Sequence, residues 1–116
     1  MDIENMETLL KALSERTRLR IMVLLTQGEL RVCDLMAALD MPQSTVSRHL
    51  SYLKKARWIQ SRRKGSWIYY RLVRSESALQ QKLWSMLDKY LQQIPEVRSD
   101  LRTLRSYLAK REPSSA

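Results

Sequence analysis

The chain has 116 residues, enough for a single domain with a modest core, and its low content of glycine (two residues) and proline (three) favours helices. It has no apolar run that could cross a membrane, no signal peptide at its acidic amino terminus, and one cysteine, which cannot form an internal disulfide. We therefore expect a cytoplasmic protein without membrane contact. The formal net charge of +9 favours an anionic partner.

The first part of the sequence predicts three helices. Apolar residues with i, i+3, i+4, i+7 spacing mark an amphipathic helix over about residues 3–13. A second helix is expected to begin after Ser14, a suitable N-cap, and to end at Gly28. Apolar residues cover most of its circumference, so it should be the central core helix. "ELR" is expected to be a short extended link to a short third helix that ends near Pro42.

The segment "QSTVSRHLSYLKK", residues 43–55, predicts a helix with one buried and one polar face. Val46, Leu50 and Leu53 form the buried stripe. A short helix, a tight turn and a second helix with a polar-basic outer face make a helix-turn-helix over about 32–56, whose second helix enters the DNA major groove. Arg can pair with guanine, Gln with adenine, and Ser or Thr with a base or a phosphate. The polar face comprises Ser44, Arg48, Ser51 and Lys55, flanked by Thr45, Ser47 and Tyr52.

A β-hairpin over about 58–73 should follow, because "WIQSRR" and "WIYYRLV" alternate around the turn signal "KGS". A basic hairpin after a helix-turn-helix is a wing, and its tip is expected to contact phosphates or the minor groove. The aromatic residues on its second strand could stack on single-stranded bases, but ordinary cross-strand packing also explains them. The expected contact residues at the tip are Arg62, Arg63 and Lys64.

The whole net charge lies in this region. Between Met41 and Ser75 there are nine basic residues, and no Asp or Glu lies between Asp40 and Glu76. The other 12 basic residues balance the 12 acidic ones. A charge run is commonly a solvated face, but this strict separation of sign favours nucleic acid as the partner.

Two further apolar stripes run through residues 79–94 and, after Pro95, through residues 97–108. Their spacing resembles a coiled coil but covers too few heptads for a free one. Together with the first helix they offer more apolar surface than one small protomer buries, so we expect a homodimer formed by the helices at about 3–13 and 76–110. The predicted fold is mainly α with a small β-hairpin, a single winged helix-turn-helix domain over 1–111 with a disordered tail at 112–116.

Residues 29–72, "ELRVCDLMAALDMPQSTVSRHLSYLKKARWIQSRRKGSWIYYRL", resemble the ArsR/SmtB family of bacterial winged-helix repressors. The combination of "QSTVSRHL" with "RRKGSWIYY" is more specific than a helix-turn-helix pattern alone. The resemblance implies a homodimer on double-stranded operator DNA that leaves the DNA when an effector binds. It also implies that the residues facing the groove are Gln43, Ser44, Thr45, Ser47 and Arg48.

The sequence departs from this family at the sensor. Arsenite-responsive members carry "ELCVCDLC", and the matching positions here are Arg31, Cys33 and Met36. Residues 77–94 contain no His or Cys for a zinc-type site. Cys33 is either an inert small hydrophobe or, with Arg31 lowering its pKa, a reactive thiol that senses metalloid, alkylation or oxidation. We expect an unidentified small effector, with no metal and no cofactor.

The same sequence bears on other possible functions. His49 lies at the edge of the buried stripe, where a structural or phosphate-contacting role fits better than a metal site. No catalytic set or phosphate-binding glycine loop is visible, so we expect no enzyme. A nucleoid-type protein that binds DNA without sequence preference is the main alternative, and a single-strand or RNA binder is a weaker one.

Overall fold

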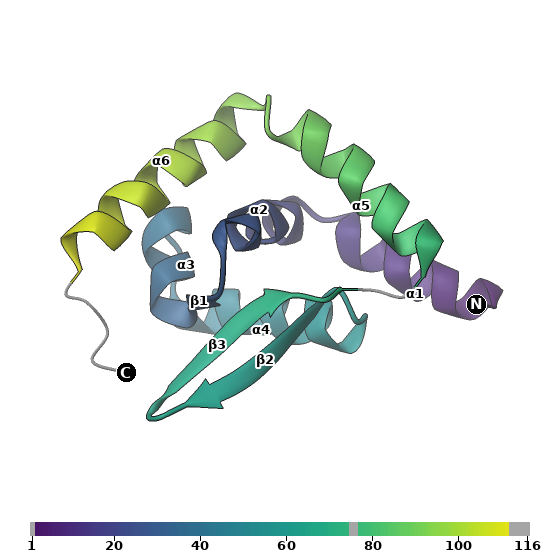
Figure 1. The fold of residues 1–116 in the computed structure, drawn as a ribbon, viewed down its shortest axis with the longest axis horizontal. Helices are drawn as coiled ribbons and strands as arrows, with labels where there is room; N and C mark the ends of the chain where they lie inside the picture. Colours follow the sequence, from purple (N-terminus) through teal and green to yellow (C-terminus); the bar gives the residue numbers. More distant parts are fainter. Residues whose placement is uncertain (1, 75–76, 112–116) are drawn as a thin grey trace.

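The computed structural model describes residues 2–74 and 77–111, and Figure 1 shows their arrangement. The predicted tail at 112–116 and the predicted helix start at Glu76 lie outside these ranges. The elements in chain order are α1 (Ile3–Leu13), α2 (Arg16–Leu24), the 3-10 turn η1 (Leu25–Gln27), β1 (Leu30–Arg31), α3 (Val32–Leu39), α4 (Gln43–Lys55), β2 (Ile59–Lys64), β3 (Trp67–Leu72), α5 (Ala78–Leu91) and α6 (Pro95–Lys110).

The boundary between α1 and α2 differs from the predicted one. Ser14 ends α1, and its hydroxyl donates to the Lys11 carbonyl at 2.9 Å. Glu15 is the N-cap of α2, because its two carboxylate oxygens accept from the backbone N–H groups of Thr17 and Arg18 at 3.1 and 3.0 Å. One carboxylate satisfies two of the unpaired donors at the start of a helix, whereas a serine hydroxyl would satisfy one.

The core surrounds α2, as the sequence predicts. Four successive residues of this helix, Ile21 to Leu24, are at most 1% exposed. They pack with the buried stripe of α4, with Leu35 of α3 and with Ile59 of β2. Gly28 ends the segment with a φ of 132°, a conformation that side-chain-bearing residues rarely adopt.

The wing belongs to a three-stranded antiparallel sheet with the order β1-β3-β2. The predicted hairpin forms β2 and β3, with Ile59 opposite Leu72 and Lys64 opposite Trp67. The predicted extended link pairs with the outer side of β3 and becomes β1. The helix-turn-helix and its wing are therefore joined by backbone hydrogen bonds as well as by the loop after α4.

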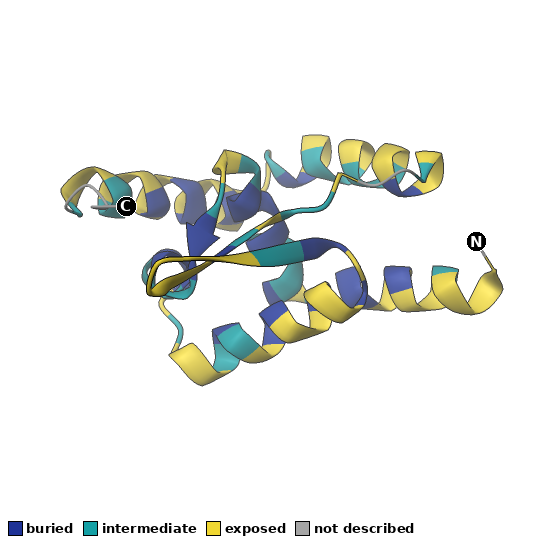
Figure 2. Ribbon diagram, turned by 60° about the horizontal axis from the view of Figure 1, so that its bottom comes forward, coloured by how far each residue is buried: buried dark blue, intermediate teal, exposed yellow. Residues whose placement is uncertain are grey.

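The last two helices form an arch over the core (Figure 1). Pro95 begins α6, which packs on α3 and α2 through Val97, Leu101 and Leu104. This stripe is therefore buried inside the protomer. In contrast, α5 is largely exposed (Figure 2), with Met86 and Tyr90 61% and 62% exposed. Among the described residues, no helix combines the length and apolar character that crossing a membrane requires.

Candidate nucleic-acid interface

Helix α4 presents the predicted polar face to the surface. Val46, Leu50 and Leu53 are at most 1% exposed and hold the helix against the core. Of the predicted contact residues, Thr45 and Ser47 are half-buried at the edge of this face. The exposed ones are Gln43, Ser44, Arg48 and Ser51. The first turn of α4 is thus a hydrogen-bonding surface with no acidic residue.

The wing carries its cations at the end next to the turn. Arg63 and Lys64 are exposed, and no hydrogen bond or ion pair within the described residues involves their side chains. Arg62 is different, because its guanidinium donates two hydrogen bonds to Glu29 at 2.6 and 2.7 Å. This hydrogen bonding lowers the pKa of Glu29 and raises that of Arg62. Of the three predicted wing contacts, two are free and one is held by the turn before β1.

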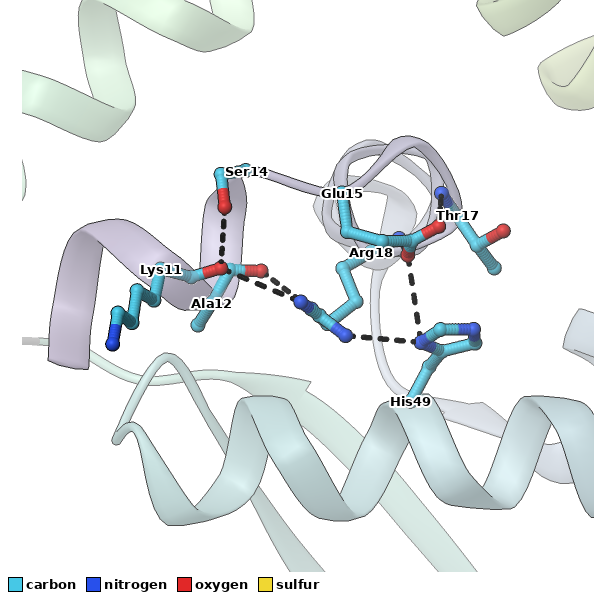
Figure 3. Close-up of polar contacts among 7 residues, drawn as sticks. All are labelled: Lys11, Ala12, Ser14, Glu15, Thr17, Arg18 and His49. Atoms are coloured by element: carbon cyan, nitrogen blue, oxygen red, sulfur yellow. Dashed lines mark hydrogen bonds and ion pairs between the residues drawn. The ribbon is translucent and has the colours of Figure 1, made fainter.

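A cluster of polar contacts connects α4 to the junction of α1 and α2 (Figure 3). Arg18 Nε donates to the Ala12 carbonyl at 2.7 Å, and Arg18 Nη1 lies 3.3 Å from His49 Nδ1. Because a guanidinium only donates, Nδ1 must accept, so neutral His49 carries its proton on Nε2. Glu15 Oε2 lies 3.4 Å from the same nitrogen. Arg18 also stacks on Tyr52, with 4.0 Å between its guanidinium carbon and the ring centroid.

His49 is a structural residue in this cluster. It is 8% exposed, and burial lowers its pKa, a shift that the neighbouring Arg18 and Arg48 reinforce and that Glu15 opposes. Glu15 in turn has a lowered pKa: its burial raises the pKa, but the hydrogen bonds from Thr17 and Arg18 outweigh that effect.

The segment whose sequence resembles the thiol motif of arsenite-responsive repressors lies in a buried ionic cluster. Asp34 is fully buried and binds the Arg31 backbone N–H at 2.8 Å and the Arg111 guanidinium. The Arg31 guanidinium lies 3.7 Å from Asp34 and 4.3 Å from the ring centroid of Trp67. Cys33 is half-buried near Tyr107 of α6, whose pKa is raised by burial and by the neighbouring thiol. Among the described residues, no three His, Cys, Asp or Glu side chains gather as a metal site would require.

Sequence reasoning missed the partners of four cations. Arg18 and Arg31 point into the protein, and Arg20 binds Asp100 of α6 with two hydrogen bonds at 2.8 and 2.9 Å. The available signal was weak: Arg18 and Arg20 lie in the core helix α2, next to its buried apolar residues, where a cation needs a partner. Nothing in the local pattern pairs Glu29 with Arg62.

A short helix, a turn, an exposed polar helix and a hairpin joined to them by one sheet define a winged helix-turn-helix protein. Residues 15–61 match the model of the arsR family of bacterial regulatory proteins. The chain is 48% identical over 65 residues to the arsenical resistance operon repressor of Escherichia coli, a match covering 55% of this chain and 56% of that protein. It thus spans about half the length of this relative.

Two further similarities cover more of the relative. The transcriptional activator HlyU of Vibrio cholerae is 31% identical over 83 residues, which is 66% of this chain and 77% of HlyU. A homodimeric winged helix-turn-helix domain from Mycobacterium bovis, described as a possible ArsR-family regulator, superposes with a TM-score of 0.65 at 30% identity, covering 80% of this chain and 87% of that one. The chain belongs to the ArsR/SmtB family of winged helix-turn-helix transcriptional regulators.

Proposed function

We propose that the protein is a sequence-specific transcriptional repressor that binds double-stranded operator DNA as a homodimer. The observation that carries this proposal is the exposed first turn of α4, which is acid-free and polar rather than uniformly cationic. Polar side chains can discriminate base edges, whereas cations alone give binding without sequence preference. This favours operator recognition over a nucleoid-type function.

The homodimer is supported by the exposed large apolar residues of α1 and α5. A two-fold axis through these helices would present two copies of α4 to one face of a duplex. Successive major grooves on one face lie about 34 Å apart, so the operator should be an inverted repeat with half-sites roughly 10 base pairs apart. Footprinting on DNA selected from a random pool tests this spacing.

The proposed function assigns base recognition to α4 and phosphate binding to the wing, and these two roles can be tested separately. If Arg48 pairs with a guanine, Arg48→Ala should weaken operator binding by about 1–3 kcal/mol and relax the preference at one base pair. Lys64→Gln should instead weaken operator and scrambled DNA alike and reduce the salt slope by about one unit, because it removes one phosphate contact. Fluorescence anisotropy over a salt series measures both quantities.

Arg98→Gln on the exposed face of α6 is the matched control, because it also removes one positive charge and lies away from α4 and the wing. It should leave both quantities close to their wild-type values. Equal weakening of operator and scrambled DNA by Arg48→Ala would contradict base recognition by α4.

We further propose that the effector is not an arsenite ion held by three thiolates. Cys33 supplies one thiolate, Met36 offers only a weak thioether, and Arg31 is already paired with Asp34. Low micromolar arsenite should therefore release the protein from its operator poorly, and Cys33→Ser should bind DNA almost as tightly as wild type. A gel-shift titration measures both.

The alternative is a metalloid or thiol-reactive sensor that uses Cys33 alone, alkylated or oxidised to a sulfenic acid. The contact between Cys33 and Tyr107 favours it, since a modified sulfur would disturb the packing of α6 on α3. The same gel shift with peroxide and a thiol alkylator decides between the two. Release by arsenite, peroxide or alkylator that disappears in Cys33→Ser would establish the thiol sensor.

A further inference from the structure

A cavity of about 580 Å³ lies where four segments of the chain meet. Its walls come from α1, from the end of α4, from the residues after β3 and from the start of α5. This volume is in the usual range for small-molecule sites, about 300–1,000 Å³. Its lining includes no residue of the first turn of α4 or of the wing tip, but it shares Lys55 with the polar face of α4.

Two hydrogen bonds connect the segments around the cavity. Trp58 Nε1 donates to the Leu9 carbonyl at 2.9 Å, which attaches the turn between α4 and β2 to α1. Gln80 Nε2 donates to the Arg57 carbonyl at 3.0 Å, which attaches α5 to the same turn. The site is therefore built from defined contacts rather than from loosely placed surface side chains.

The lining of the cavity is positively charged. It includes Lys55, Arg57 and Arg74, all exposed, and no carboxylate of a described residue. No hydrogen bond or ion pair within the described residues involves these three side chains. The amino-terminal end of α5, a helix of 14 residues, also borders the cavity, and its dipole adds positive potential there; the Ser77 hydroxyl at this end accepts a hydrogen bond from the Gln80 backbone N–H.

We propose that this cavity binds a small polyanion, a molecule with two or more carboxylate or phosphate groups, and that this molecule is the effector. The inference rests on the proposed function, which needs an effector. Three cations and the positive end of a helix around one cavity repel one another when the cavity is empty. A ligand with two or more negative charges would remove this repulsion.

The position of the cavity explains how a ligand would act on DNA binding. Lys55 and Arg57 belong to the end of the DNA-reading helix, whereas Asn5 and Ser77 belong to α1 and the start of α5. A ligand that bridges them fits only one placement of α4 relative to the two helices. Binding would therefore favour that placement of α4 over the others, to the extent that the ligand binds it more tightly.

On α1, the cavity-lining residues and the exposed apolar residues are different ones. Asn5 and Thr8 line the cavity, whereas the exposed apolar residues Ile3 and Leu10 border a different hollow on α1. A dimer contact through Ile3 and Leu10 would therefore not require the cavity-lining residues of α1.

The test is calorimetric titration of the full chain with citrate and with pyrophosphate at constant ionic strength. The key variant is Arg57→Gln/Arg74→Gln. The matched control is Arg98→Gln/Arg102→Gln, which removes two exposed arginines of α6 and so changes the net charge equally. We expect at least one probe to bind wild type and control alike, with a Kd raised about tenfold or more in the cavity variant, since two charge-assisted contacts are lost.

Each remaining outcome contradicts the inference. Binding of neither probe to wild type overturns it, and so does equal loss in cavity variant and control, which would indicate a general charge effect. If the cavity variant instead weakens operator binding and reduces the salt slope as Lys64→Gln does, these cations bind DNA phosphates, which also overturns it. Because the titration contains no DNA, its failure leaves the proposed repressor function standing. Conversely, failure to find an operator would contradict the proposed repressor function but not the binding of a polyanion in this cavity.

A second measurement tests the link to DNA. The binding probe should lower operator affinity of wild type by about tenfold more than an equal ionic strength of chloride does, and this excess should vanish in the cavity variant. Equal effects of probe and chloride would contradict an effector role.

Discussion

Arg18 shows how one side chain can serve three elements. Its guanidinium binds the end of α1 through the Ala12 carbonyl, meets His49 on α4 and stacks on Tyr52 one turn further along. The placement of α4 relative to α1 therefore depends on a charged side chain of α2, the helix that the sequence predicts as the central core helix.

The pH dependence of stability should report on His49, the only histidine in the chain. Burial holds the folded-state pKa of His49 below the ordinary value of 6.5. As the pH falls through 6.5, the histidine is therefore protonated to a greater extent in the unfolded chain than in the folded one. The free energy of unfolding should therefore fall as the pH drops from 7.5 to 5.5. The lowered pKa of Glu15 makes the free energy of unfolding depend on pH only below about the ordinary glutamate pKa of 4.5, which is outside this pH range. Urea denaturation at the two pH values measures the change.

His49→Gln is the control for this prediction, since it keeps a polar side chain that does not titrate. Its stability should change little between pH 7.5 and 5.5. If wild type and variant lose the same free energy over this range, His49 is not the group responsible.

At the scale of elements, the end of α4 adopts an unusual backbone conformation. Arg57 has a φ of 66°, and the N–H groups of Arg57 and Trp58 donate to the carbonyls of Lys54 and Leu53 at 3.0 Å each. This is a Schellman ending, in which the left-handed position normally carries glycine. An arginine there is strained by its Cβ.

Arg57→Gly should therefore raise the free energy of unfolding by about 0.5–1 kcal/mol. Glycine removes the strain of the left-handed backbone conformation, and this gain is partly offset because glycine gives the unfolded chain more conformational entropy. Lys54→Gly, three residues earlier inside α4, should lower it by about 1 kcal/mol, because glycine there only loses helix propensity. Urea denaturation of both variants checks the opposite signs. A destabilising Arg57→Gly would show that the arginine side chain contributes more than its strained backbone removes.

The two C-terminal helices illustrate how similar stripes can have different uses. The apolar stripe of α6 is buried against α3 and α2. Arg20 of α2 and Asp100 of α6 form an ion pair with two hydrogen bonds in the same contact. The stripe of α5 keeps Leu79, Met86 and Tyr90 at the surface. In the predicted dimerisation region at 76–110, only α5 therefore retains a large apolar surface for a partner.

At the scale of the whole molecule, this surface predicts the oligomeric state. Met86→Glu would place a charge in an apolar dimer interface, where an unpaired carboxylate is strongly unfavourable. Light scattering should give twice 13.7 kDa for wild type and a shift toward 13.7 kDa for the variant at micromolar concentration. Thr103→Glu on the exposed side of α6 should remain dimeric. A wild-type monomer under these conditions would contradict both the interface and the inverted-repeat operator.

The sequence by itself determined what depends on local pattern. Helical periodicity identified the core helix α2 and the stripe of α4, and strand alternation around Lys64-Gly65-Ser66 identified the hairpin. Family identity followed from the same short motifs. These features are visible because backbone geometry repeats every 3.6 or 2 residues, so their signal lies within a short window.

The tertiary structure decided which polar residues are free to act. It paired Arg62 with Glu29 across 33 residues and Arg20 with Asp100 across 80, and it added β1 to the wing. It also gathered Lys55, Arg57 and Arg74 around one cavity. Charge composition could locate the cations in the sequence but not assign their partners, because an ion pair depends on distances in space that no local period encodes.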